Sequence, residues 1–290
     1  MWYNEHMHTK DASAIAVVHS LPTGKSHVSY SELANWYECS FRHKLMNIDR
    51  IEVDSHPSQY TVFGSAIHAG CEVFLRTGNM DMSAAPTYLD ENWGEDLEEY
   101  RLSVIGTKQE FPEKAHWQVL AVDMLADIPE FMNTTFPGWR YVAAEQRLDE
   151  SIDGHPDVRF KGFIDGILLV PDKKGRDRHW IIDFKTASWG WPAAKKGDFK
   201  VQMQLRLYKH FWAKKMGLTL KDVRTGFVLI KRDAKNGKRC ELVQVSAGEE
   251  TTKRSLVIID NMVNATRRGI ALKNRDNCRF CDYYETEHCP

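Results

Sequence analysis

The stretch WIIDFKTAS, residues 180–188, decides which fold we expect of this chain. Its first three residues are apolar and indicate a buried strand, yet the run ends in Asp183 and Lys185 with one apolar residue between them. Side chains two positions apart on a strand point to the same side, so the carboxylate and the ammonium should face one spot. Charge that is buried there needs partners. For an isolated D-x-K, an ion pair at a strand end is the simplest explanation.

The preceding predicted strand offers a second carboxylate. It contains GFIDGILLV, residues 162–170, with Asp165 eighteen residues before Asp183. If the two strands pair, both carboxylates can lie at one end, where their repulsion raises their pKa values unless a cation lies between them. A hard ion such as Mg²⁺ binds one or two carboxylates together with water and phosphate oxygens. With a lysine beside it to orient an attacking water, such a site has what phosphodiester hydrolysis requires.

The rest of the chain predicts helices first and a sheet later. Apolar residues at helical spacing predict helices over 29–46, 61–78, about 83–98, 113–135, about 198–216 and about 248–268. Short apolar runs between turn sequences predict strands over 140–148, 158–170, 178–188, about 223–231 and about 239–246. We expect Gly78 and Gly217 to end their helices, and Ser29 or Ser31 to begin the first.

This order of elements predicts an α/β or α+β domain with a helical N-terminal part. Three parts of one integrated domain are expected: a mainly helical part over 1–135, a core over 136–247, and a C-terminal helix with a Cys-rich tail over 248–290.

Composition and charge bound the class of protein. Hydrophobic residues make up 42% and charged residues 27% of the chain, as in ordinary soluble proteins. We see no secretory leader and no apolar run long enough to span a membrane, so a cytoplasmic protein without a membrane partner is expected. The net charge of -1 argues against binding of nucleic acid by the chain as a whole. However, residues 195–239 contain 14 Lys/Arg and 3 Asp/Glu, a local net of +11, and form either a solvated face or a track for phosphates.

The ordered motifs resemble those of the PD-(D/E)XK nuclease superfamily, and more narrowly its RecB-like branch. GFID followed by IIDFKT is similar to the metal-binding core of the superfamily. Upstream, Gly64 to His68 in GSAIH is similar to the G-x-x-x-H motif of the branch, and downstream Gln204 to Tyr208 in QLRLY is similar to its Q-x-x-x-Y motif. The resemblance covers roughly residues 29–290 and implies a restriction-endonuclease-like fold, in which helices flank a mixed central sheet.

The resemblance also implies roles for the motif residues. Mg²⁺ or Mn²⁺ would be held by His68, Asp165, Asp183 and the backbone carbonyl of Phe184, and Lys185 would be the catalytic lysine. The residue types suit this chemistry, because a metal lowers the pKa of bound water and stabilises the transition state. Two further motif residues lie four apart on one helical face and would contact DNA or shape the site, namely Gln204 and Tyr208.

The activity implied is that of a metal-dependent deoxyribonuclease. We expect an exonuclease that acts on single strands or frayed ends in DNA recombination, repair or CRISPR adaptation, in a phage or a CRISPR-linked setting. No G-x-x-x-x-G-K-[ST] motif is present, so any unwinding would come from a helicase or another recombination or CRISPR-adaptation partner. The alternatives are a non-catalytic or weakly catalytic DNA-binding subunit and a structure-specific endonuclease.

Several neighbouring residues have both a functional and a structural explanation. Glu145, one strand earlier, is either a further acid of the metal site or an exposed strand residue. Glu72 lies one turn past His68 and could hydrogen-bond it. Trp189 and Trp191, just after the D-x-K strand, could stack on unpaired bases or pack in the core.

The C-terminal cysteines form a separate constellation. CRFCDYYETEHC has the pattern C-x2-C-x7-C with Cys278, Cys281 and Cys289, and in a reducing compartment such a cluster favours metal over disulfides. Some RecB-like proteins, among them AddB-type subunits and CRISPR-adaptation nucleases, bind an iron–sulfur cluster through one upstream and three C-terminal cysteines. The segment 29–45 is similar to that upstream segment and contains Cys39. The resemblance therefore implies a structural [4Fe–4S] cluster.

A zinc site is the alternative for the same four thiolates. His43 and His288 are possible substitute ligands for it. The remaining two cysteines, Cys71 and Cys240, are expected to be buried and without a metal.

Overall fold

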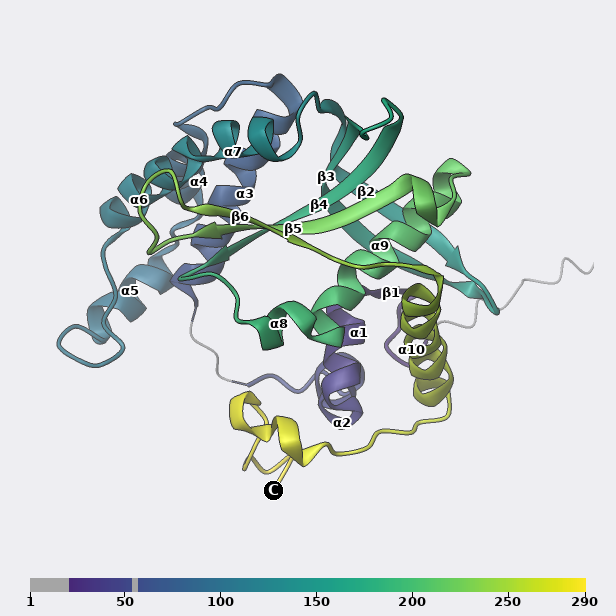
Figure 1. The fold of residues 1–290 in the computed structure, drawn as a ribbon. Helices are drawn as coiled ribbons and strands as arrows, with labels where there is room; N and C mark the ends of the chain where they lie inside the picture. The colour runs from purple at the N-terminus through teal and green to yellow at the C-terminus, as the bar shows by residue number, and fades with distance from the viewer. Residues whose placement is uncertain (1–20, 54–56) are drawn as a thin grey trace, which may run out of the picture.

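The computed structural model describes residues 21–53 and 57–290. Residues 1–20, in which no secretory leader is expected, lie outside this range. The described chain forms a mixed sheet with helices on both faces, as the sequence predicted (Figure 1). Within the described part, no helix has both the length and the apolar character needed to cross a membrane.

The sheet has the order β1-β3-β4-β5-β6, and β2 pairs with β3. Its strands are β1 His27–Ser29, β2 Arg140–Ile152, β3 His155–Pro171, β4 Asp177–Ala187, β5 Val223–Lys231 and β6 Cys240–Gln244. The strands β2, β3 and β4 follow one another as two antiparallel hairpins. The β4–β5 pairing is parallel because α9 crosses over between these two strands.

The strands β1 and β4 pair with the same edge of β3, one after the other. β2 pairs along nearly the whole length of β3, so β1 and β4 must use its other edge. On that edge β1 pairs with Arg159–Lys161 and β4 with Gly166–Pro171. The four residues between these segments, 162–165, have no strand partner there among the described residues. This opening in the sheet contains the GFID motif.

Two hydrophobic cores lie on opposite faces of the sheet. One face carries α3, α4, α6 and α7, whereas the other carries α9, on which α1 and α10 pack. The helices are α1 Tyr30–Glu38, α2 Ser40–His43, α3 Gln59–Thr77, α4 Ala84–Asn92, α5 Glu95–Ser103, α6 Lys114–Ala126, α7 Ile128–Thr135, α8 Ala193–Gly197, α9 Phe199–Met216 and α10 Glu249–Arg267. Short helical turns cover Lys44–Ile48 (η1), Leu220–Asp222 (η2) and Arg275–Phe280 (η3).

The predicted helix ends are confirmed at two glycines. Gly78 and Gly217 end α3 and α9 with φ of 74° and 63°, a left-handed conformation that glycine adopts without strain. Two predicted helices are each divided: the segment 83–98 spans α4 and the start of α5, and the segment 113–135 spans α6 and α7.

The prediction of one helix over 29–46 is wrong, because the backbone is extended at Cys39 with φ of -160° and ψ of 107°. Ser29 caps α1 as expected, accepting a hydrogen bond from Glu32 N (3.2 Å). The break itself is contacted by the C-terminal tail. Phe41 N donates to Leu272 O (3.1 Å) and Asn274 N donates to Cys39 Sγ (3.4 Å). Contacts across more than 230 residues thus compete with local helix propensity.

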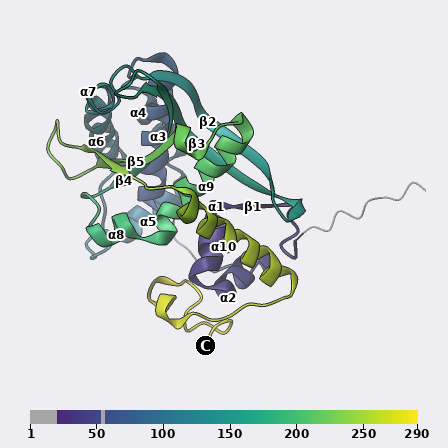
Figure 2. The same cartoon turned by 45° about the vertical axis from the view of Figure 1, so that its right-hand side comes forward.

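The tail lies against α1 and α2, as both ribbon views show (Figures 1 and 2). The side-chain amides of Asn274 and Asn277 donate to Glu38 O at 2.8 and 2.7 Å. Tyr283 Oη donates to Ile51 O (2.8 Å). The apolar core beneath the tail is small and centres on Leu45, Tyr283 and Cys289.

Candidate active site

A cleft of about 800 Å³ opens between α3 and the strands β2 and β4. It brings together residues that are far apart in the sequence. Those with functional groups are Tyr60, His68, Glu72, Tyr88, Glu145 and Lys185. The cleft therefore lies where the sequence motifs from α3 and β4 meet.

Asp165 and Asp183 lie where β3 and β4 separate. The last pair of the β3–β4 ladder is Gly166↔Ile182, so the two aspartates are the next residues beyond it. Asp165 Oδ2 accepts a hydrogen bond from the backbone N–H of Phe184 (2.8 Å). The predicted strand pairing thus places the two carboxylates beside each other.

Buried Asp183 is compensated by two partners. Its side chain is 1% exposed, and its Oδ1 accepts a hydrogen bond from Gln204 Nε2 (2.7 Å). Its Oδ2 lies 2.7 Å from Lys185 Nζ but accepts no hydrogen bond of ordinary geometry from the described residues. Asp183 and Lys185 therefore face one spot, as their spacing on a strand requires.

Gln204 and Tyr208 lie on α9 beside the Asp183–Lys185 pair. Both are buried, at 8% and 5% exposed, and Gln204 Nε2 lies 3.5 Å from Tyr208 Oη. The ring of Tyr208 lies so close to Gly162 that a Cβ there would come within 2.8 Å of Cε1. Of the two roles expected for Gln204 and Tyr208, this geometry supports shaping the site rather than presenting a DNA-contacting surface.

His68, Glu145 and Asp165 form a group that could hold a metal ion. One ligand atom from each lies within 4.8 Å of the others, and His68 Nδ1 lies 3.4 Å from Asp165 Oδ2. Burial lowers the pKa of His68, which favours the neutral imidazole that metals bind. An imidazole with two carboxylates suits a divalent ion such as Mn²⁺ or Mg²⁺. The residues present thus fit the metal that the motifs imply.

The sequence did not decide whether Glu145 is an acid of the metal site or an exposed strand residue. The structure places it beside His68 and Asp165. The pairs Ala144↔Gly166 and Gln146↔Ile164 set Glu145 opposite Asp165. Its φ is 48°, a left-handed conformation that costs a residue with a Cβ about 1 kcal/mol or more. The signal available in the sequence was its position in the hairpin register, opposite the aspartate of GFID.

Burial and mutual repulsion disfavour the charged forms of the carboxylates in this site. Burial raises the pKa of Asp165 well above its usual value, and the neighbouring Asp183 raises it further. Burial also raises the pKa of Glu145. For Lys185, burial by itself lowers the pKa, but Asp183 and Asp165 outweigh it and the pKa is raised. Two negative groups this close favour a bound cation.

Three further residues, Glu72, Trp189 and Trp191, also had both a functional and a structural explanation in the sequence. Glu72 lines the cleft and makes an ion pair with Arg76 (2.6 Å). Trp191 is buried, with its ring 5.2 Å from that of Phe227, whereas Trp189 is 64% exposed. Core packing therefore explains Trp191 but not Trp189.

The basic segment 195–239 is neutralised in part by acids outside it. Ion pairs join Lys196 and Lys231 to Glu241, at 2.5 and 3.6 Å, and Lys214 to Asp153 (2.7 Å). The segment is therefore not one continuous track of free cations.

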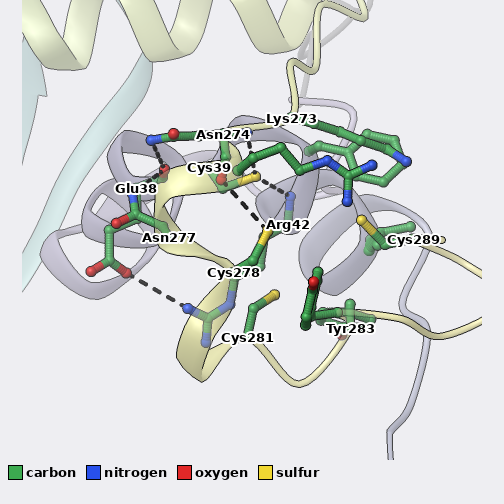
Figure 3. A pocket seen from close by; sticks show the side chains of 14 residues that line it. Glu38, Cys39, Arg42, Lys273, Asn274, Asn277, Cys278, Cys281, Tyr283 and Cys289 are labelled. Carbon is green, nitrogen blue, oxygen red and sulfur yellow. Dashed lines mark hydrogen bonds and ion pairs between the residues drawn. The ribbon is translucent and has the colours of Figure 1, made fainter.

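The four cysteines of the second constellation line one pocket between α1, α2 and the tail (Figure 3). Cys39 comes from the α1–α2 break, whereas Cys278, Cys281 and Cys289 come from the tail. Two backbone N–H groups, of Arg42 and Asn274, donate to Cys39 Sγ, each at 3.4 Å. The structure thus brings the four predicted thiols together.

The remaining cysteines and the candidate histidines lie elsewhere. Cys71 and Cys240 belong to the core around α3, where burial raises the pKa of both thiols, that of Cys240 to about 12. His43 is buried beside Glu32 (3.1 Å), and His288 lies 3.3 Å from Glu287. Neither histidine lines the four-cysteine pocket.

Comparison with known proteins supports the assignment to the superfamily. Residues 27–286 match the family described as the PD-(D/E)XK nuclease superfamily. A crystal structure from Eubacterium rectale, described as a "Putative exonuclease", is similar over 99% of this chain and 96% of its own, with a TM-score of 0.55 and 12% identity. At that identity the likeness concerns the fold. No protein of curated function matches the chain in sequence.

Proposed function

The chain belongs to the PD-(D/E)XK nuclease superfamily, and from this premise we propose that it is a metal-dependent deoxyribonuclease of the RecB-like branch. The observation that carries the proposal is the convergence of His68, Glu145 and Asp165 beside the Asp183–Lys185 pair. Candidate metal ligands and the ammonium of Lys185 thus lie close together, as phosphodiester hydrolysis requires.

The protein's own groups have distinct tasks in this proposal. His68, Glu145 and Asp165 would hold Mg²⁺ or Mn²⁺, with Asp183 and the carbonyl of Phe184 as the further ligands that the resemblance implies. The metal would supply an acidified water and stabilise charge on the phosphate. Lys185 carries its proton at neutral pH, because the aspartates raise its pKa. Its ammonium would therefore stabilise charge on the phosphate oxygens or orient the attacking water.

Gln204 is a positioning residue. Its amide donates to Asp183 Oδ1 (2.7 Å) and leaves Oδ2 to Lys185. Tyr208 packs behind it against Gly162, so both residues of the Q-x-x-x-Y motif fix the direction of one carboxylate.

Exposed aromatic groups at the cleft support a substrate with unpaired bases. Tyr60 lines the cleft and is 52% exposed, and the guanidinium of Arg232 lies 4.9 Å from its ring centre. Trp189, four residues after Lys185, is exposed as well. Aromatic and guanidinium faces stack on single-stranded bases regardless of sequence. An exonuclease that acts on single strands or free ends, in recombination, repair or CRISPR adaptation, is therefore the activity we propose.

The four-cysteine pocket would hold a structural [4Fe–4S] cluster. The resemblance to RecB-like proteins that carry such a cluster supports this choice, and zinc on the same four thiolates is the alternative. The two N–H donors to Cys39 Sγ would in addition stabilise a cluster-bound thiolate.

A cleavage assay tests the activity. End-labelled linear and circular single-stranded DNA are incubated with Mg²⁺ or Mn²⁺ and either wild type or Asp183→Ala. We expect metal-dependent loss of the linear substrate alone, and none with the variant. Loss of both substrates would indicate an endonuclease. No cleavage with either metal would contradict the proposal and favour a DNA-binding subunit of a larger complex.

A further inference from the structure

A second large cleft, of about 840 Å³, lies between α9, η2, the start of β5 and the N-terminus of α10. None of the active-site residues described above lines it. Its polar side chains are Lys209, Lys221, Arg224, Thr225, Gln244, Ser246, Glu249, Glu250 and Thr251.

Lys209 is the unusual member of this cleft. The residue is only 7% exposed, yet among the described residues its ammonium has neither a hydrogen-bond nor an ion-pair partner. The apolar stem of Lys209 is therefore buried, whereas its ammonium is not among the fully enclosed polar atoms and reaches the cleft. Charged groups in folded proteins are normally paired or solvated. The side chain lines the cleft, so the charge is available to a ligand there.

The neighbouring side chains add positive charge to this cleft. Arg224 and Lys221 line the same cleft and have no ion pair within the described part of the chain. Burial, followed by the charge of Arg224, lowers the pKa of Lys209 to about 8. The nearby carboxylate of Asp222 is already occupied by Arg178 (2.6 Å) and Thr219 (2.6 Å).

Two carboxylates, those of Glu249 and Glu250, also line the cleft. Both residues are exposed, and neither lies within 4 Å of a cation of the cleft in the described structure. They therefore leave Lys209 without a counter-ion.

The N-terminus of α10 opens into the same cleft. This helix has 19 residues and begins after Gly248, which provides no side-chain cap. The first backbone N–H groups of a helix have no partner within the helix and favour an anion. A Cβ at Gly248 would meet nothing within 4 Å, so there is room for a ligand above these groups.

We propose that this cleft binds a phosphate group through Lys209, Arg224 and the N-terminus of α10. The ligand is a phosphate ester, carried either by a nucleic-acid strand or by a free nucleotide. The site does not depend on the proposed activity, because it shares no residue with the active-site cleft.

Binding of inorganic phosphate to the full chain is the first arm of the test. Calorimetry in EDTA compares wild type with Lys209→Met, which keeps the apolar stem, and with Lys209→Arg, which keeps the charge. We expect Lys209→Met to bind about tenfold more weakly and Lys209→Arg to retain most of the affinity. Lys173→Met, an exposed lysine in the β3–β4 turn, is the matched control and should behave as wild type. If Lys209→Met does not fold, the exposed Arg224→Gln serves instead.

The second arm distinguishes the sources of the phosphate. Anisotropy of a labelled single-stranded oligonucleotide in EDTA is measured over a range of salt concentrations, and binding of a deoxynucleoside monophosphate is measured separately. For a strand, loss of one contact should reduce the slope of log K against log salt by about 0.7. For a free nucleotide, only the monophosphate affinity should fall. If Lys209→Met and Arg224→Gln bind phosphate, monophosphate and DNA as the control does, the proposal is overturned.

Discussion

The active-site cleft and the cysteine pocket are built in opposite ways. The cleft rests on the central strands of the sheet and on α3, with a large core on each face of the sheet. The cysteine pocket rests on a loop-rich tail whose core centres on three buried residues, Leu45, Tyr283 and Cys289. Burial of apolar surface is the main source of stability, so the first site should be ordered by the fold alone, whereas the second should need a bound group. Three substitutions test this difference between the two sites.

The largest effect is expected from Lys185→Ala. Loss of the ammonium should reduce single-turnover cleavage by about a hundredfold to a thousandfold, because it removes a preorganised charge beside the phosphate. The fold should persist, since Gln204 still holds Asp183. Cleavage rates and the circular dichroism melting curve check both statements. Unchanged cleavage would refute the role of Lys185, and loss of the fold would show that the cleft is not ordered by its cores.

The second effect is expected from Cys281→Ser. Anaerobically purified wild type should be brown and contain about four iron and four sulfide per chain. The variant should lose this content, and its Tm should fall by about 5–10 °C, because the tail loses its cross-link to α1 and α2.

Cys240→Ala, which changes a thiol outside the pocket, is the control and should keep the iron. A colourless wild type with one zinc would contradict the cluster. An iron-free variant with an unchanged Tm would show that the hydrogen bonds from Asn274 and Asn277 suffice to hold the tail.

The smallest effect is expected from Glu145→Gln. The exchange keeps the side-chain size but removes one negative ligand, so Mn²⁺ affinity measured by calorimetry should fall about tenfold. Glu72→Gln changes an acid of the same cleft that already pairs with Arg76, and should have a weaker effect. Equal losses in the two variants would mean that general negative charge, rather than the strained position opposite Asp165, attracts the metal.

Much of the framework could be predicted from the sequence because it depends on local patterns. Helix periodicity, the glycines that end α3 and α9, and the two hairpins are properties of short segments. The spacing of Asp183 and Lys185 fixes their common direction once the segment is a strand. The partners of these residues are nonlocal, however, and Glu145 and Trp189 could not be separated from ordinary surface or core residues.

The fold class, the superfamily and the residue types available for chemistry follow from the sequence alone. The tertiary structure sets the break at Cys39, because a tail more than 230 residues away makes hydrogen bonds there. It also decided that Glu145 lies opposite Asp165, that Gln204 is directed at Asp183 and that Lys209 is buried without a partner. Each of these depends on how strands and helices pack, and the energies of such long-range contacts outweigh local preferences.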